Sequence, residues 1–102
     1  MAVLDINKDN FDECIKKGKV LVDCYANWCG PCKMLSPIID EVSEEVTDCI
    51  FYKLNVDEEE EIAAKYGIMS IPTLLYFENG KLISTNVGLT DKKGVLKIIE
   101  KQ

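Results

Sequence analysis

The sequence contains no histidine, and only one pair of its cysteines is closely spaced, Cys29 and Cys32. A structural zinc site needs about four ligands, commonly from two such pairs or from one pair together with histidines. The other three cysteines stand alone on separate segments, at Cys14, Cys24 and Cys49. Since the ligands for a structural metal are missing, we expect no metal site in this chain.

Long apolar segments are also missing, because no uninterrupted run of hydrophobic residues exceeds four. We therefore expect neither a transmembrane helix nor the core of a signal peptide. The net charge of −6 argues against nucleic acid and anionic membrane surfaces as partners, because both repel a negative protein. With 102 residues, 47% of them hydrophobic, the sequence predicts one globular domain over 1–102.

We expect the protein to be a monomer. Its five cysteines form an odd number, so at least one thiol must stay unpaired within it. Three solitary thiols beside one close pair are typical of a reducing compartment, most simply the cytoplasm.

The pentapeptide Trp28-Cys29-Gly30-Pro31-Cys32 separates two segments with different patterns. Lys19 to Tyr25 is short, apolar and rich in β-branched residues, as buried strands are. From Lys33 to Val46, apolar residues recur at helical spacing. Pro31 suits the first position of that helix, where its missing N–H would have no partner. The two cysteines should therefore share one face of the first helical turn, close enough to form a disulfide.

The start of a helix favours a negative charge, because its first backbone N–H groups have no partner within the helix. Cys29 meets this field first, so we expect its thiolate to be stabilised. Cys32, one turn inside, should be more buried. In such a pair, Cys29 attacks a substrate disulfide, and Cys32 then attacks the mixed disulfide and releases the product. A purely structural disulfide is the weaker alternative, because so short a loop removes little entropy from the unfolded chain.

Two charged residues interrupt strands that are otherwise predicted to be buried: Asp23, and Lys53 in the strand 49–56. A buried carboxylate is costly unless it has a purpose. With no histidine in the chain, Asp23 is the candidate to accept the proton of Cys32, and burial should raise its pKa. The structural alternative is that Asp23 only pairs with Lys53 to hold two neighbouring strands together.

The remaining segments continue an alternation of strands and helices, which predicts an α/β fold. The five acids from Asp57 to Glu61 are interpreted as a helix start suited to the helix dipole, with a cation site as the alternative. Helices should cover both faces of a sheet in which the three strands separated by helices are parallel and the hairpin strand is antiparallel. The other predicted elements are a strand from Ala2 to Ile6, a helix capped by Asn7 or Asp9 and ending near Lys17, strands over 73–78 and 81–87 joined by an Asn79-Gly80 turn, and a last helix capped by Thr90.

Taken together and in order, these features resemble the thioredoxin family over nearly the whole chain, from Phe11 to the last helix. The segment Trp28-Cys29-Gly30-Pro31-Cys32-Lys33 matches the active-site motif of the family at every residue. Five further family features have counterparts in this sequence. Asp23 corresponds to the buried aspartate, Lys53 to the lysine of the next strand and Pro37 to the proline of the long helix. Ile71-Pro72-Thr73 corresponds to the segment with a cis proline, and Gly88 to the glycine beside the substrate groove.

The resemblance implies the thioredoxin fold, with three layers, four helices and a mixed five-stranded sheet in the order first, third, second, fourth, fifth. It also implies reduction of protein disulfides by a dithiol cycle of Cys29 and Cys32, with no cofactor beyond this redox-active disulfide. The implied partners are a thioredoxin reductase and disulfide-containing target proteins. Gly30 and Pro31 resemble the residues that tune the reducing members of the superfamily. The implied docking surface consists of Trp28, Ile71, Pro72, Val87, Gly88 and Leu89.

A second class of function stays open at this point, namely a binding module or scaffold with the thioredoxin fold and an incidental dithiol. Some members of the wider superfamily also bind metal through the cysteine pair, usually at a dimer interface. The chain departs from the family pattern at Cys24, where an aromatic residue is usual, and at Tyr25, where a tryptophan is common.

Overall fold

The structure is a computed structural model of the chain and describes residues 3–100. Five strands and four helices follow one another along these residues in the predicted order. No helix within this range combines the length and apolar character that crossing a bilayer demands. The elements are β1 (Leu4–Asp5), α1 (Phe11–Ile15), β2 (Lys19–Tyr25), α2 (Gly30–Glu45), β3 (Cys49–Asn55), α3 (Glu60–Lys65), β4 (Thr73–Glu78), β5 (Lys81–Val87) and α4 (Lys92–Glu100).

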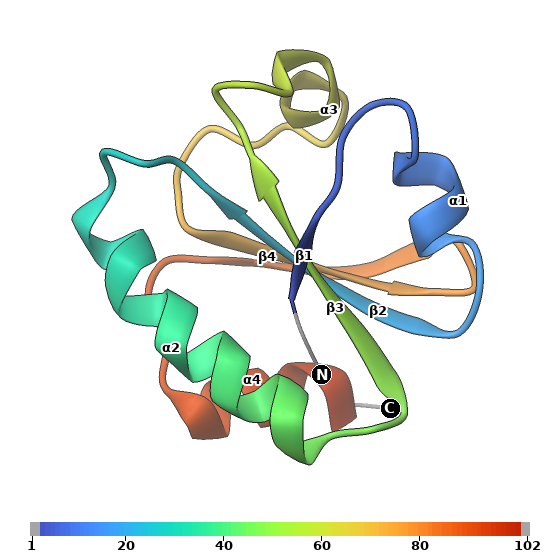
Figure 1. Cartoon of the computed structure of the whole chain (residues 1–102), viewed down its shortest axis with the longest axis vertical. Helices are drawn as coiled ribbons and strands as arrows, with labels where there is room; N and C mark the ends of the chain where they lie inside the picture. The colour runs from blue at the N-terminus through green and yellow to red at the C-terminus, as the bar shows by residue number, and fades with distance from the viewer. Residues whose placement is uncertain (1–2, 101–102) are drawn as a thin grey trace.

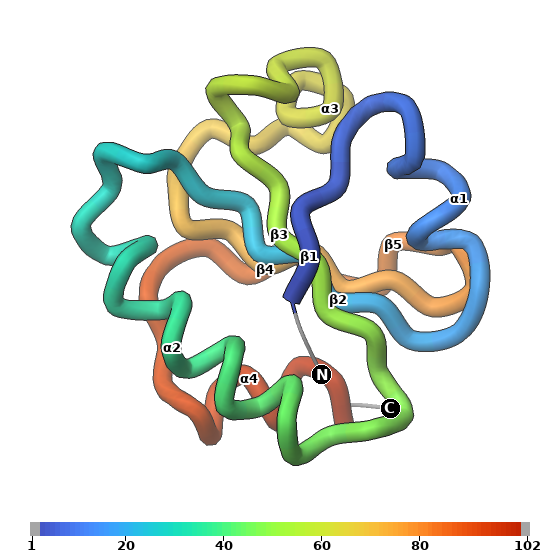
Figure 2. Tube along the Cα trace, in the orientation of Figure 1, coloured from blue at the N-terminus to red at the C-terminus, as the bar shows by residue number. Residues whose placement is uncertain are grey.

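The strands form one mixed sheet in the order β1-β3-β2-β4-β5. β1, β3 and β2 are parallel, as predicted, whereas β4 runs antiparallel to β2 and β5 antiparallel to β4. Because β4 returns along β2, its first residue, Thr73, pairs with Cys24 near the end of β2. Figure 2 shows the result: the loop before α2 and the loop before β4 lie at the same end of the sheet.

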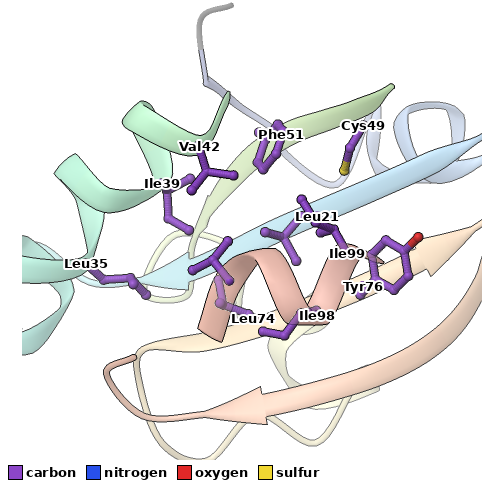
Figure 3. Packing of buried hydrophobic residues seen from close by; sticks show 11 residues of the cluster. Leu21, Leu35, Ile39, Val42, Cys49, Phe51, Leu74, Tyr76, Ile98 and Ile99 are labelled. Carbon is purple, nitrogen blue, oxygen red and sulfur yellow. The ribbon is translucent and has the colours of Figure 1, made fainter. Parts of the chain in front are cut away.

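Helices cover both faces of the sheet, which gives the three layers that were expected. Figure 1 shows α2 and α4 on one side and α1 and α3 on the other. On the first side, Leu21 and Leu74 of the strands pack against α2 and α4, as Figure 3 shows. On the other side, the core contains Phe11, whose ring contacts those of Tyr66 and Phe77 at centroid distances of 5.5 and 5.9 Å. The predicted thioredoxin fold is confirmed.

Several element boundaries differ from the predictions, and three of these belong to α1 and α4. Asn10, not Asn7 or Asp9, precedes α1, because the Asn7 side chain instead accepts hydrogen bonds from the Asp9 and Asn10 N–H groups in the preceding turn. α1 also ends before Lys17. Asp91, not Thr90, precedes α4, and its Oδ1 accepts from the Gly94 N–H at 2.9 Å.

The predicted first strand shrinks to two residues, and Ala2 lies outside the described residues. Pro31 is the second residue of α2 and not its first, since Cys29 already occupies the N-cap and the helix begins at Gly30.

Candidate active site

The two closely spaced cysteines lie where β2 leads into α2. Cys29 is the N-cap residue, and its sulfur accepts a hydrogen bond from the Cys32 N–H at 3.2 Å. The pair is joined by a disulfide, with the two Cα atoms 5.3 Å apart. The predicted difference in burial between them is absent from this oxidised form, because Cys29 is 4% and Cys32 3% exposed. Ala26 belongs to the same buried cluster as the two cysteines, and Ile71 packs against this cluster.

The loop before β4 forms the second side of the site. The Ile71–Pro72 peptide bond is cis, as the resemblance implied. Pro72 is buried, and Ile71 packs against the cysteines. The Pro72 carbonyl accepts from the Gly88 N–H at 2.8 Å, which joins this loop to the end of β5. Gly88 has a φ of 101°, which a residue with a Cβ rarely adopts.

Exposed apolar side chains lie on the segments around the disulfide. Trp28, Val87 and Leu89, all predicted, are 71%, 67% and 45% exposed. Sequence reasoning missed two more, Met34 of α2 and Met69 of the cis-proline loop, which are 63% and 94% exposed. Met34 lines a groove together with Leu89. Met69 could have been identified from the sequence, because it is an apolar residue close to the Ile71-Pro72 segment.

Trp28 is exposed, yet its indole has a fixed partner. Its Nε1–H donates to Oδ2 of Asp57 at 2.7 Å, and the Asp57 N–H donates to Oδ1 of the buried Asn55 at 2.9 Å. The five acids from Asp57 to Glu61 therefore have different roles. Glu60 and Glu61 occupy the first turn of α3, as predicted, whereas Asp57 accepts the hydrogen bond from the Trp28 indole. Between residues 3 and 100, no cluster of three or more potential metal ligands is present.

Asp23 lines a pocket of about 160 Å³ together with Cys32 and Lys53. Asp23 is 5% exposed, and its Oδ1 has no hydrogen-bond partner. Burial raises the pKa of Asp23 to about 7; the charge of Lys53 opposes this rise, and that of Asp40 adds to it. Asp23 and Lys53 pair in strand register, but no salt bridge joins them among the described residues.

The three remaining cysteines are not paired. Cys24 and Cys49 are buried in the core, and burial raises the pKa of both thiols, that of Cys49 to about 12. Neither is therefore a thiolate near neutral pH. Cys14 is half-buried on α1, on the other face of the sheet from α2.

Comparison with known proteins assigns this arrangement to a family. The family model described as Thioredoxin matches residues 2–101. The chain belongs to the thioredoxin family. It is 43% identical over 96 residues to the thioredoxin of Chlamydia muridarum, with 94% of each chain covered. It is 40% identical over 102 residues to that of Bacillus subtilis, with 99% of this chain and 98% of the relative covered.

A solved structure supports the same assignment. The thioredoxin of Plasmodium falciparum superposes with a TM-score of 0.90 at 35% identity, with 98% of each chain covered. Thioredoxins are thiol-disulfide oxidoreductases that need no prosthetic group, and the chain is a disulfide reductase of this kind. The scaffold alternative is not favoured.

Proposed function

We propose that Cys29 and Cys32 carry out the reduction, with Cys29 as the attacking thiol. The Cys29 thiolate attacks one sulfur of the target disulfide, which forms a mixed disulfide and releases the other target sulfur as a thiolate. Cys32 then loses its proton and attacks the Cys29 sulfur. The Cys29–Cys32 disulfide forms, the second target sulfur leaves as a thiolate, and two electrons have passed to the target. The position of Cys29 at the N-cap of α2 is the observation that carries this assignment.

Asp23 is the proposed acceptor of the Cys32 proton. Both residues line one pocket, which is large enough for water to carry the proton between them. A carboxyl group with a pKa of about 7 is well matched to proton transfer near neutral pH. Lys53 in the same pocket would keep the Asp23 pKa from rising further, and so keep part of Asp23 ionised.

The surface around Cys29 would bind the target. Gly30 and Pro31 would tune the reactivity of the dithiol, as the family motif implies. The backbone near Pro72 would hold an extended segment of the target by strand addition. Exposed apolar side chains on both sides of the disulfide support this docking role. The proposed docking residues are Trp28, Ile71, Pro72, Val87, Gly88 and Leu89.

The cellular role that we propose is that of a cytoplasmic electron carrier in redox homeostasis. A thioredoxin reductase would return the Cys29–Cys32 disulfide to the dithiol, and disulfide-containing proteins would receive the electrons. We also propose that 1–102 form one domain and act as a monomer. The three unpaired cysteines support a reducing compartment.

Insulin precipitation tests the proposal. With dithiothreitol as reductant, catalytic amounts of the protein should accelerate the turbidity that follows reduction of the insulin disulfides. Cys29→Ser should return the rate to that of dithiothreitol alone, because no thiol remains at the N-cap. Cys14→Ser, the matched control, should keep full activity. Equal rates with and without the wild-type protein would refute the proposed function.

A further inference from the structure

Tyr25, at the end of β2, forms a hydrogen bond that reaches across the sheet. Its hydroxyl donates to Oδ1 of Asp5 at 3.0 Å. Asp5 lies on β1, and β3 separates β1 from β2 in the sheet. The phenol side chain therefore spans the intervening strand β3 to reach its partner.

The strand register places this hydrogen bond beside the proposed proton acceptor. Asp5 pairs with Lys53, and Lys53 pairs with Asp23, so the three positions form one row across β1, β3 and β2. Side chains at paired positions point to the same face, and so do residues two apart on one strand. Tyr25 thus shares the α2 face with Asp23. In agreement, Tyr25 lines the pocket that contains Asp23 and Cys32.

The protonation state of Asp23 depends on how little water reaches it. Loss of water on burial is the largest cause of its raised pKa. Burial and the bond to Asp5 also raise the pKa of Tyr25, to about 12, although the Asn55 side chain acts in the opposite direction. The phenol therefore remains a donor to the Asp5 carboxylate throughout the pH range in which Asp23 titrates.

We propose that the Tyr25–Asp5 hydrogen bond is a latch that holds the phenol ring as one wall of the pocket, so that the pocket holds the water that relays the proton but admits little more from bulk solvent to Asp23. Tyr25 and Asp5 are then positioning residues for the proton transfer from Cys32. This inference rests on the proposed role of Asp23. The other charged or titratable groups that face the pocket or act on Asp23 or Tyr25 are Lys53 on β3, Cys32, Lys33 and Asp40 on α2, and Glu58 after β3. None of them makes the hydrogen bond that forms the latch.

The latch can be tested in the oxidised protein, where Cys29 and Cys32 do not titrate. The readout is the pH midpoint of the Asp23 carboxyl carbon in NMR spectra, which needs no target protein. In Tyr25→Phe we expect the midpoint to fall by about 0.5 pH unit or more, because water enters the pocket and favours the carboxylate. Tyr76→Phe is the matched control, since it removes the 2.7 Å bond from Tyr76 to Glu78, outside this pocket, and should leave the midpoint unchanged.

Two substitutions of the exposed Asp5 separate the latch from the charge of that residue. Asp5→Asn keeps a hydrogen-bond acceptor and should leave the midpoint near its wild-type value. Asp5→Ala removes the acceptor and should reproduce the shift of Tyr25→Phe, even if the latter folds poorly. The latch is refuted if the midpoint stays unchanged in Asp5→Ala, or if Asp5→Asn and Asp5→Ala lower it equally. Failure of the proposed function would show separately, as a wild-type protein that does not reduce insulin.

Discussion

Replacing Cys32 by serine should trap a target protein on Cys29 as a mixed disulfide. Serine keeps the shape of the site but cannot attack the Cys29 sulfur, so the second step of the exchange is lost. Without added thiols, the adduct should persist for minutes to hours, the time scale of uncatalysed disulfide rearrangement. Non-reducing electrophoresis and intact mass measurement would detect it as a species that contains one protein chain and one target molecule.

The control for this experiment is Cys29→Ser, which retains Cys32. Cys32 is the third residue of α2 and lines the pocket that contains Asp23, whereas Cys29 is the N-cap residue and does not line this pocket. We therefore expect Cys29→Ser to form little or no adduct under the same conditions. An adduct that forms equally well on Cys32 alone would reverse the assigned roles of the two thiols.

Replacing Asp23 by asparagine should slow the resolution of the mixed disulfide by about 10²-fold, the effect of a lost general base. Formation of the mixed disulfide should keep its rate, because that step uses only Cys29. Trp28 is the single tryptophan of the chain and lies next to Cys29. Stopped-flow fluorescence of Trp28 would therefore follow both steps without interference from other tryptophans.

The same substitution should change how stability depends on pH. The pKa of Asp23 is raised from an ordinary value of 3.8 to about 7, so the folded protein holds this proton more tightly than the unfolded chain does. The stability that the folded protein gains from binding this proton is fully present below pH 3.8 and is lost as the pH rises through about 7. Asparagine carries no such proton. As the pH is raised from about 5 to 8, the free energy of unfolding of oxidised Asp23→Asn, measured with urea, should therefore increase by about 2–3 kcal/mol relative to that of wild type.

The alternative role of Asp23, as half of a structural ion pair, predicts the opposite result. If Asp23 only held Lys53, its loss would leave the half-buried Lys53 cation without a partner and cost up to about 3–5 kcal/mol, while resolution would keep its rate. Asp48→Asn is a suitable control. It removes a carboxylate from an exposed salt bridge with Lys19, at 3.5 Å, and should change stability by less than about 1 kcal/mol.

Periodicity and turn chemistry were enough to predict the order of the elements. The residues between Lys19 and Val46 separate a strand, a corner and a helix without ambiguity. Asn79-Gly80 fixes the hairpin, because both residues adopt positive φ. Helix caps were harder to predict. Polar residues crowd positions 7–10 and 90–91, and the choice of cap among them depends on side-chain hydrogen bonds within each turn.

The contacts that complete the site could not be predicted from the sequence, because they join residues far apart in the chain. Asp57 looked like one of five acids at a helix start, and only the fold brings it to the Trp28 indole. Asp5 and Tyr25 lie on strands that are not neighbours in the sheet. Whether Asp23 lies opposite Lys53 was open from the sequence alone, and the parallel register of β2 and β3 places the two residues side by side.

A single-turnover experiment tests the central claim, that one dithiol made of Cys29 and Cys32 delivers two electrons to a target disulfide. The fully reduced protein is mixed with an excess of a peptide that contains one disulfide, and the reaction is quenched with acid and mapped by mass spectrometry. We predict one peptide disulfide reduced per protein chain, a loss of two protein hydrogens, and a new disulfide between Cys29 and Cys32 only. A protein that remains reduced, or a new disulfide that involves Cys14, Cys24 or Cys49, would contradict this claim.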